Sequence, residues 1–349
     1  MRKFDYNFLR SGVIPAKFIE LAMSIGELRV VAAERKRIYT DAFGELEKIA
    51  KVQSVKSSNA IEGIVTSDSR IQDIVNKSSA PINHDEAEIA GYRDALNLIH
   101  TNYQQLDLCE KDILMLHSTL LSYTELNYGE KYKAVDNVIM QVDAYGNRSV
   151  RFRPTSAAET PKAMEQWWLA YMEARQDVGI SPLLLIPCVI LDFLCIHPFS
   201  DGNGRMSRLL SLLLLYKEGY DVVEFISYEE QINNYKDLYY DALRISSQGW
   251  ETNENDYFTF AENFIFTLLR CYKELNMRFS VVNGKKIPKN KRIEEILKKS
   301  LTPLSKADIC KALPDVSPST VESVLGQLLR QGVITKIGTS RRTKYIYNR

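Results

Sequence analysis

Two apolar segments stand out along the chain and enclose a short polar stretch. Residues 182–195 are almost uninterrupted in Leu, Ile, Val and Phe, and residues 209–216 are similarly apolar. Both segments are predicted to be buried helices. The connection between them carries a histidine, an aspartate, an asparagine, two glycines and two arginines. Polar chemistry placed between two ordered core helices is typical of an active site, so we expect the active site there.

The remaining pattern up to about residue 280 is mostly helical. Further helices are predicted over residues 15–37, 40–62, 84–103, 108–121, 161–175, 228–246 and 257–279, the second with Thr40 and Asp41 at its N-cap. Residues 135–153 alternate between apolar and polar positions around a turn at 144–147, which predicts a β-hairpin. We therefore expect an all-α bundle with one hairpin, divided into an N-terminal region, residues 1–100, and a core, residues 101–280.

The C-terminal part of the chain has a different pattern. Residues 281–290 are predicted to be a linker, and short helices are predicted over 292–299, 305–312 and 317–331. A hairpin over 332–347 would follow, which is the element order of a winged helix-turn-helix domain, here residues 291–349.

This C-terminal part is also strongly basic. From residue 284 it holds 15 Lys and Arg against 5 Asp and Glu, a net +10, while the whole chain is at +1 and the rest is therefore at −9. Such an asymmetry favours contact with DNA, although winged helices also dock proteins. The expected wing carries the basic residues Lys336, Arg341, Arg342 and Lys344.

Composition narrows the class of protein. With 349 residues, of which 45% are hydrophobic, the chain can bury a large core. Its five cysteines lack C-x-x-C spacing and are expected to be reduced. We expect neither a signal peptide nor a membrane-spanning segment, and hence the cytoplasm. His100 and His117 have no second ligand at helical spacing, so core or surface positions are expected for them rather than metal binding.

The glycines and arginines of the polar stretch point to a phosphate ligand. Gly202 and Gly204 flank Asn203 just before a helix, where backbone amides and the helix N-terminus favour an anion. Arg205 and Arg208 lie three apart in the first turn, so both side chains are expected to project toward the same end. The combination predicts a triphosphate, with a basic helix cap of no further function as the simpler alternative.

The two remaining ionisable groups suggest the chemistry. Asp201 would be unfavourable beside phosphates unless a divalent cation lay between them, which indicates Mg²⁺. His197 can accept a proton near neutral pH. The stretch therefore predicts nucleotidyl or phosphoryl transfer to a hydroxyl, with His197 as the base.

Residues 197–208 resemble the signature of the Fic family, H-x-F-x-[D/E]-G-N-G-R-x-x-R, at every specified position. The expected hairpin, at about 136–153, resembles the family's flap. Residues 58–63, Ser-Asn-Ala-Ile-Glu-Gly, resemble its inhibitory motif [S/T]-x-x-x-E-[G/N], in the subclass that carries it before the core. The resemblance covers about residues 1–280. Lys133 stands where many members carry an arginine after a tyrosine.

The resemblance implies an activity and a set of roles. Fic proteins transfer AMP from ATP to a Ser, Thr or Tyr hydroxyl of a protein and release pyrophosphate. His197 would deprotonate the hydroxyl, Asp201 would bind Mg²⁺, and the flap would align the target by strand addition. Glu62, with Ser58 in the same motif, would pair with Arg208 and displace the γ-phosphate. The remaining nucleotide contacts would come from Gly202, Asn203, Gly204, Arg205, Arg208 and, by resemblance to aromatics near the adenine, Tyr240, for which helix packing is an equal alternative.

Other functions stay open at this point. One is a nucleotide-sensing, DNA-binding regulator whose Fic core turns over ATP weakly or not at all. Another is a related transfer of phosphocholine, UMP or phosphate, or the removal of AMP, although a complete motif with Arg208 favours ATP and AMP transfer. The target protein is not identified by the sequence, and a homodimer is an open alternative.

Overall fold

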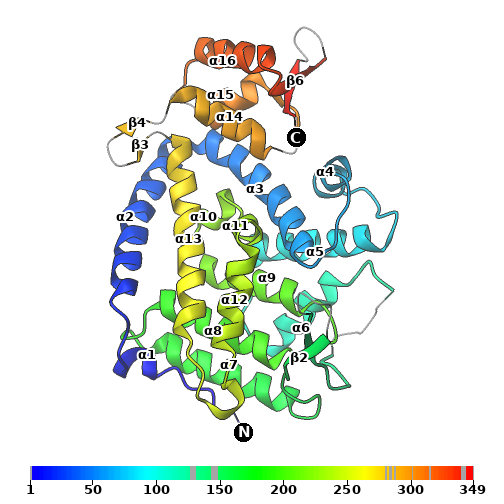
Figure 1. The fold of residues 1–349 in the computed structure, drawn as a ribbon, viewed down its shortest axis with the longest axis vertical. Helices are drawn as coiled ribbons and strands as arrows, with labels where there is room; N and C mark the ends of the chain where they lie inside the picture. Colours follow the sequence, from blue (N-terminus) through cyan, green and yellow to red (C-terminus); the bar gives the residue numbers. More distant parts are fainter. Residues whose placement is uncertain are drawn as a thin grey trace.

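The computed structural model describes residues 2–125, 131–142, 148–279, 281–282, 285–286, 288–300, 302–313, 316–338 and 343–348. An elongated helical body carries a smaller C-terminal unit at one end (Figure 1). The body contains α1 (Phe8–Ser11), α2 (Lys17–Ile38), α3 (Thr40–Ile61), α4 (Asp68–Lys77), α5 (His84–Asn102), α6 (Glu110–Leu120), α7 (Thr160–Gln176), α8 (Pro182–Ile196), α9 (Asn203–Lys217), α10 (Val222–Phe225), α11 (Tyr228–Asn234), α12 (Lys236–Ser246) and α13 (Phe258–Phe279).

Helices α8 and α9 form the centre of the body. Nearly every residue of both is buried, which confirms the prediction of two core helices. They pack on each other, with α7 and α13 against α8 and α5 against α9. Because the polar connection joins α8 to α9, it is anchored on both sides by buried helices. None of the described helices combines the length and apolar character needed to cross a bilayer.

A glycine permits one close approach near this connection. Helices α5 and α6 pack closely, and a Cβ added at Gly91 of α5 would collide with the backbone carbonyl of Leu120 at the end of α6. The close packing keeps α6 against the polar connection, where Leu120 also lies beside Gly202.

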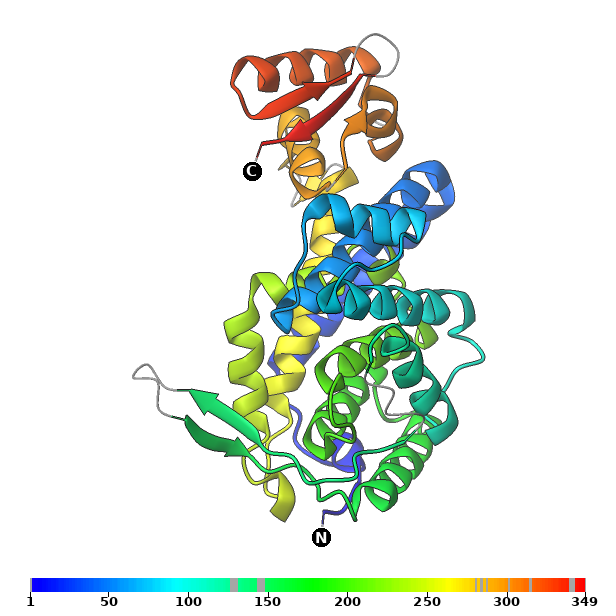
Figure 2. The same cartoon turned by 90° about the vertical axis from the view of Figure 1, so that its right-hand side faces the viewer.

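The predicted hairpin is present. Strands β1 (Ile139–Val142) and β2 (Arg148–Phe152) pair antiparallel and project from the edge of the helical body (Figure 2). The register shifts by one residue between Ile139 and Met140. The turn predicted at 144–147 lies outside the described residues.

The C-terminal unit has a hydrophobic core of its own, separate from that of the body. Its elements are β3 (Val281–Val282), β4 (Lys285–Lys286), α14 (Lys289–Lys299), β5 (Leu304–Ser305), α15 (Lys306–Ala312), α16 (Pro318–Arg330), β6 (Ile334–Ile337) and β7 (Lys344–Tyr347). The last sheet has the order β5-β7-β6. Three helices and a hairpin thus occur in the predicted order, while their interpretation as a winged helix stays a prediction.

Three details differ from the sequence-based predictions. The segment expected as one helix over 228–246 breaks at Tyr235, whose backbone leaves the helical region (φ −129°, ψ 38°) and whose ring stacks under Arg270 at 3.6 Å. Thr40 is not the N-cap of α3; Tyr39 takes that place and stacks on Phe279. The expected linker at 281–290 holds the hairpin β3–β4 and the start of α14.

Candidate active site

The polar connection has a fixed backbone shape. Helix α8 ends at Ile196 and is followed by His197 as its C-cap residue, which adopts the left-handed conformation with φ 53°; the N–H of His197 donates to Phe193 O at 2.9 Å. Gly202, with φ 80°, precedes α9. A left-handed histidine is uncommon and persists only when neighbouring contacts hold it. The imidazole is therefore presented by a strained, supported backbone.

The start of α9 offers free backbone donors. The first hydrogen bond of the helix runs from Met206 N to Gly202 O, so the N–H groups of residues 203–205 have no acceptor within the helix. Gly202 provides no side-chain cap. The side chain of Asn203 serves the loop instead, because its amide donates to Phe199 O at 2.7 Å and accepts from Phe199 N at 2.9 Å. The helix start can accept an anion through its backbone.

A cavity of about 290 Å³ opens at this helix start. It gathers His197, Gly204 and Arg208 from the signature, Glu62 from the end of α3, and Tyr240 from α12. The cavity's other lining residues are Ile139, Arg151, Phe152, Leu194, Cys195, Tyr239, Leu243 and Ser247. The structure thus brings five predicted site residues to one cavity that has both polar and apolar lining residues, whereas Ser58, Asp201, Gly202, Asn203 and Arg205 do not line it.

Arg208 is held by the end of helix α3. Its side chain is 2% exposed and forms an ion pair of 2.8 Å with Glu62, which is 32% exposed. Its Nε also donates to Ser58 Oγ at 2.8 Å, and its Nη2 to Ser58 O at 2.9 Å. All three contacts come from residues one helical turn apart in the motif expected to be inhibitory. An arginine that could face a phosphate is thereby engaged by a carboxylate of the same chain.

Arg205 takes a different direction. It is buried in an ion pair with Glu88 of α5 and lies 3.3 Å from Asp201. The expectation that Arg205 and Arg208 project toward the same end is therefore wrong. Residues three apart lie on neighbouring parts of the helix surface, so the spacing alone does not separate the two side chains. They separate because carboxylates at different places attract them, Glu88 of α5 for Arg205 and Glu62 at the end of α3 for Arg208. A phosphate contact for Arg205 stays a prediction.

Asp201 is suited to a metal that is shared with a nucleotide. Its side chain is 49% exposed, and no group of three or more His, Cys, Asp or Glu side chains in the described ranges is arranged to hold a metal on its own. Mg²⁺ needs no such cage, because it is typically bound by one or two carboxylates together with substrate phosphates and water. A single accessible carboxylate beside an anion site fits that ion.

His197 is in its neutral form at pH 7. The pKa of its imidazole is lowered to about 4, first by burial and then by the positive charge of Lys133, while a hydrogen bond with the backbone of Leu194 and the carboxylates of Glu62 and Asp201 act in the opposite direction. A neutral imidazole can accept a proton, whereas an imidazolium cannot. The environment therefore keeps this side chain available as a base.

Several supporting residues were not foreseen from the sequence. His117 of α6 stacks on Phe199 with ring centroids 3.6 Å apart, and its Nε2 lies 3.0 Å from Asp201 O. Behind Ser58, the buried carboxylate of Glu229 accepts from Tyr92 at 2.9 Å and from Ser54 at 2.7 Å. No local motif marks such residues, because each is defined by a contact far away in the sequence.

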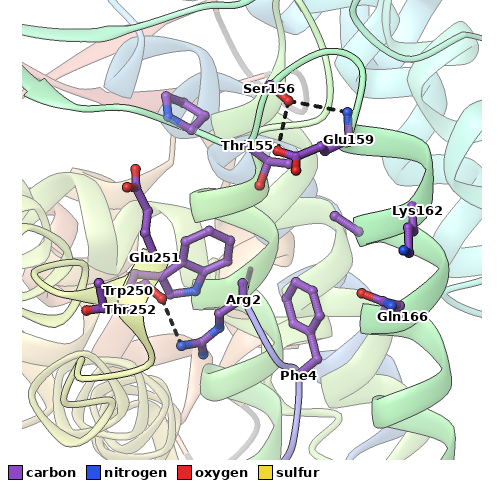
Figure 3. Close-up of a pocket in the computed structure, with 12 residues that line it drawn as sticks. Arg2, Phe4, Thr155, Ser156, Glu159, Lys162, Gln166, Trp250, Glu251 and Thr252 are labelled. Carbon is purple, nitrogen blue, oxygen red and sulfur yellow. Dashed lines mark hydrogen bonds between the residues drawn. The ribbon is translucent and has the colours of Figure 1, made fainter.

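A larger cavity lies elsewhere in the molecule. It has about 500 Å³ and is lined by the N-terminal segment, the start of α7 and the turn at Trp250 (Figure 3). Arg2 donates to Trp250 O at 3.0 Å and pairs with Asp192, a fully buried carboxylate of α8 that also accepts from Tyr6 and Tyr257. This cluster ties the N-terminal segment to α8 but contains no residue of the signature.

The fold and the cavity define an all-α protein with backbone amides at a helix start, a neutral histidine and a hairpin at the cavity's edge. Residues 107–215 match the family model of the Fic/DOC family. The chain therefore carries a Fic domain.

Curated relatives agree with this assignment. The protein adenylyltransferase Fic of Drosophila grimshawi is 26% identical over 240 residues, which span 66% of this chain and 46% of the relative. The protein of the same name from Drosophila melanogaster is 25% identical over 241 residues, with the same two coverages. The chain thus matches less than half the length of these relatives.

Solved structures show the same fold. A Fic family protein from Desulfovibrio desulfuricans superposes with a TM-score of 0.62 at 18% identity, over 96% of this chain and 97% of that one. A Fic domain containing signaling protein from Bacteroides thetaiotaomicron gives a TM-score of 0.56 at 24% identity, over 73% and 93%.

Proposed function

We propose that this chain is a protein adenylyltransferase that transfers AMP from ATP to a Ser, Thr or Tyr hydroxyl of a target protein, and that Glu62 restrains it. The names of the curated relatives support AMP transfer. The observation that carries the restraint is the ion pair of Arg208 with Glu62 inside the cavity that also holds His197 and Gly204.

In this proposal different lining residues bind different parts of ATP. The amides at the start of α9 hold phosphate oxygens, and Tyr240 with the apolar lining residues takes the adenine. The target oxygen attacks the α-phosphorus while its proton passes to neutral His197, and the bond to the β-phosphate oxygen breaks to release pyrophosphate. Mg²⁺, held by Asp201 and the phosphates, would neutralise the charge on the leaving group.

Glu62 would act by competition for one arginine. When its carboxylate occupies Arg208, the γ-phosphate loses that partner and the triphosphate cannot settle in a reactive pose. A site with Glu62 removed should keep its fold, because both Ser58 contacts to Arg208 remain.

The test is a mass-shift assay with Mg²⁺ and ATP on the full chain. The wild type should gain AMP on itself or on added protein faintly, and Glu62→Gly strongly. The double variant Glu62→Gly/His197→Ala should show no gain. Labelling that persists without the imidazole would remove His197 as the base, and no labelling by Glu62→Gly would reject the function.

DNA binding by the C-terminal unit is a second candidate function. The described lysines on its surface include Lys289, Lys291, Lys311, Lys336 and Lys344, all exposed; Arg341 and Arg342 lie outside the described residues. A salt-sensitive gel shift with the full chain, weakened by Lys336→Glu/Lys344→Glu, would support this function. Absence of binding at low salt would reject it.

A further inference from the structure

A lysine from the segment before the flap is buried behind the signature loop. Lys133 is 4% exposed. Its ammonium donates to His197 O at 2.9 Å, to Ile196 O at 3.2 Å and to the side-chain oxygen of Asn137 at 2.9 Å. Its own backbone N–H donates to Pro198 O at 2.9 Å. One residue therefore binds three consecutive carbonyls around the histidine.

The partners of this ammonium are unusual for a buried charge. In the described part of the chain, its hydrogen bonds go to two backbone carbonyls and an amide oxygen, none of which carries a formal charge. Burial lowers the pKa of Lys133 to about 8, with Asp136 acting in the opposite direction. Burying a cation without an ionic partner costs free energy of folding, so we ask what the contacts of Lys133 contribute to the signature loop.

Two features of His197 are explained by these contacts. The left-handed backbone of His197 must be held by neighbouring contacts. Lys133 provides such contacts, because it binds the carbonyl just before this residue and that of the residue itself. The imidazole also lies close enough to Lys133 for the ammonium to disfavour its protonation.

We propose that Lys133 is a positioning residue that fixes the orientation of His197 through the carbonyls of residues 196–198. The proposal deepens the proposed function, on which its transfer assay rests. It does not place Lys133 in contact with ATP, since Lys133 does not line the cavity.

The first part of the test is kinetic. Lys133→Met, Lys133→Arg and the control Lys131→Met are compared in full-length Glu62→Gly protein; Lys131 is an exposed lysine two residues earlier. Lys133→Met should lower kcat by at least about tenfold while the Kd for ATP changes by less than about twofold, since Arg208 and the α9 amides are untouched. Lys133→Arg, which keeps a buried cation with donors, should recover most of kcat, and Lys131→Met should match the parent.

The second part measures His197 without any turnover. The chain has four histidines, so imidazole ¹⁵N signals can be assigned by comparison with His197→Gln. In Lys133→Met the pKa of His197 should rise by about one unit, and in Lys133→Arg and Lys131→Met it should stay. Lys133→Gln, which retains N–H donors but no charge, should show the same rise and guards against a Met variant that does not fold.

The outcomes separate the two proposals. A kcat loss with rescue by arginine and a raised His197 pKa supports the role of Lys133. An unmoved His197 pKa, an unchanged kcat in Lys133→Met, or an arginine variant as slow as the methionine variant overturns it. If Glu62→Gly transfers no AMP, the proposed function fails, while the NMR comparison still decides the role of Lys133.

Discussion

The contact between Arg208 and Glu62 allows a quantitative prediction of ATP affinity. The perturbation is Glu62→Gln in a His197→Ala background, so that ATP is bound and not consumed. Glutamine keeps the size of the side chain and removes the charge that engages Arg208 at 2.8 Å. If Glu62 competes with a phosphate for this arginine, weakening the contact should tighten ATP binding.

The size of the effect follows from the environment of the pair. A hydrogen bond to a charged group contributes about 1.5–3 kcal/mol. Arg208 is buried, but Glu62 is 32% exposed and partly screened by water, so the lower end applies. A change of about 1.4 kcal/mol corresponds to a factor of ten, so the Kd for ATP should fall about tenfold.

A second variant at the same arginine should behave differently. Ser58→Ala removes the acceptor of Arg208 Nε in a buried site. It should lower the free energy of unfolding by about 1–3 kcal/mol and should not tighten ATP binding, because the arginine loses its support and not its competitor. Glu45→Gln, the same change on the same helix at a surface pair with Lys48, is the control.

Isothermal titration calorimetry with Mg²⁺ and ATP measures these affinities. The competition of Glu62 with ATP for Arg208 is refuted if Glu62→Gln binds ATP no more tightly than the control Glu45→Gln. An equal tightening in Ser58→Ala would also refute it, because it would show that loosening α3 in general, and not freeing Arg208 from a carboxylate, admits the nucleotide.

Further predictions concern stability. In urea unfolding, Gly91→Ala should lower the free energy of unfolding by about 2 kcal/mol, because the added Cβ collides with Leu120 O. The control Gly26→Ala, at an exposed helix position with open space, should raise it by about 0.5–1 kcal/mol. Equal effects of the two variants would contradict the close packing of α5 on α6. Asp192→Asn should lower stability by about 3 kcal/mol or more by leaving Arg2 buried without its carboxylate, and Arg2→Met should restore part of that loss in the double variant. Three histidines have pKa values near 4 in the folded chain: His100, His117 and His197. Between pH 6.5 and 4 the unfolded chain binds protons on them that the folded chain does not, so thermal stability should be constant above pH 6.5 and fall as the pH drops toward 4. A melting temperature that does not change over this range would contradict these pKa values.

Much of the body could be predicted from the sequence because its signals are local. The apolar runs on either side of the polar stretch predicted α8 to within one residue of its observed bounds, and they predicted the buried part of α9. The alternation and turn signals gave the flap. The break at Tyr235 could not be predicted, since it depends on packing against Arg270 from a distant helix, and a helical pattern continues across it.

The supporting shell of the site was harder to predict than its centre. A signature fixes the order of its own residues, so His197 and the glycines could be named. In the sequence, Lys133 stood out only as a position where many Fic members carry an arginine. Its burial depends on the fold bringing that segment behind the loop. Sequence spacing carries no information about which carbonyls an ammonium will meet.

The two arginines of the signature show why the partners decide their roles. Arg205 and Arg208 have the same chemistry and lie on the same turn, yet one is buried against Glu88 of α5 and the other is held by Glu62 and Ser58 of α3. The pair with Glu88 is almost wholly buried, so releasing Arg205 would strand a buried carboxylate. Glu62 instead sits at the end of a helix, one-third exposed, and can move into water at little cost. Of these two ion pairs, the one with Glu62 can therefore be exchanged more readily for a phosphate, and under the proposed function this difference would make Arg208 the residue for which a bound nucleotide and helix α3 compete.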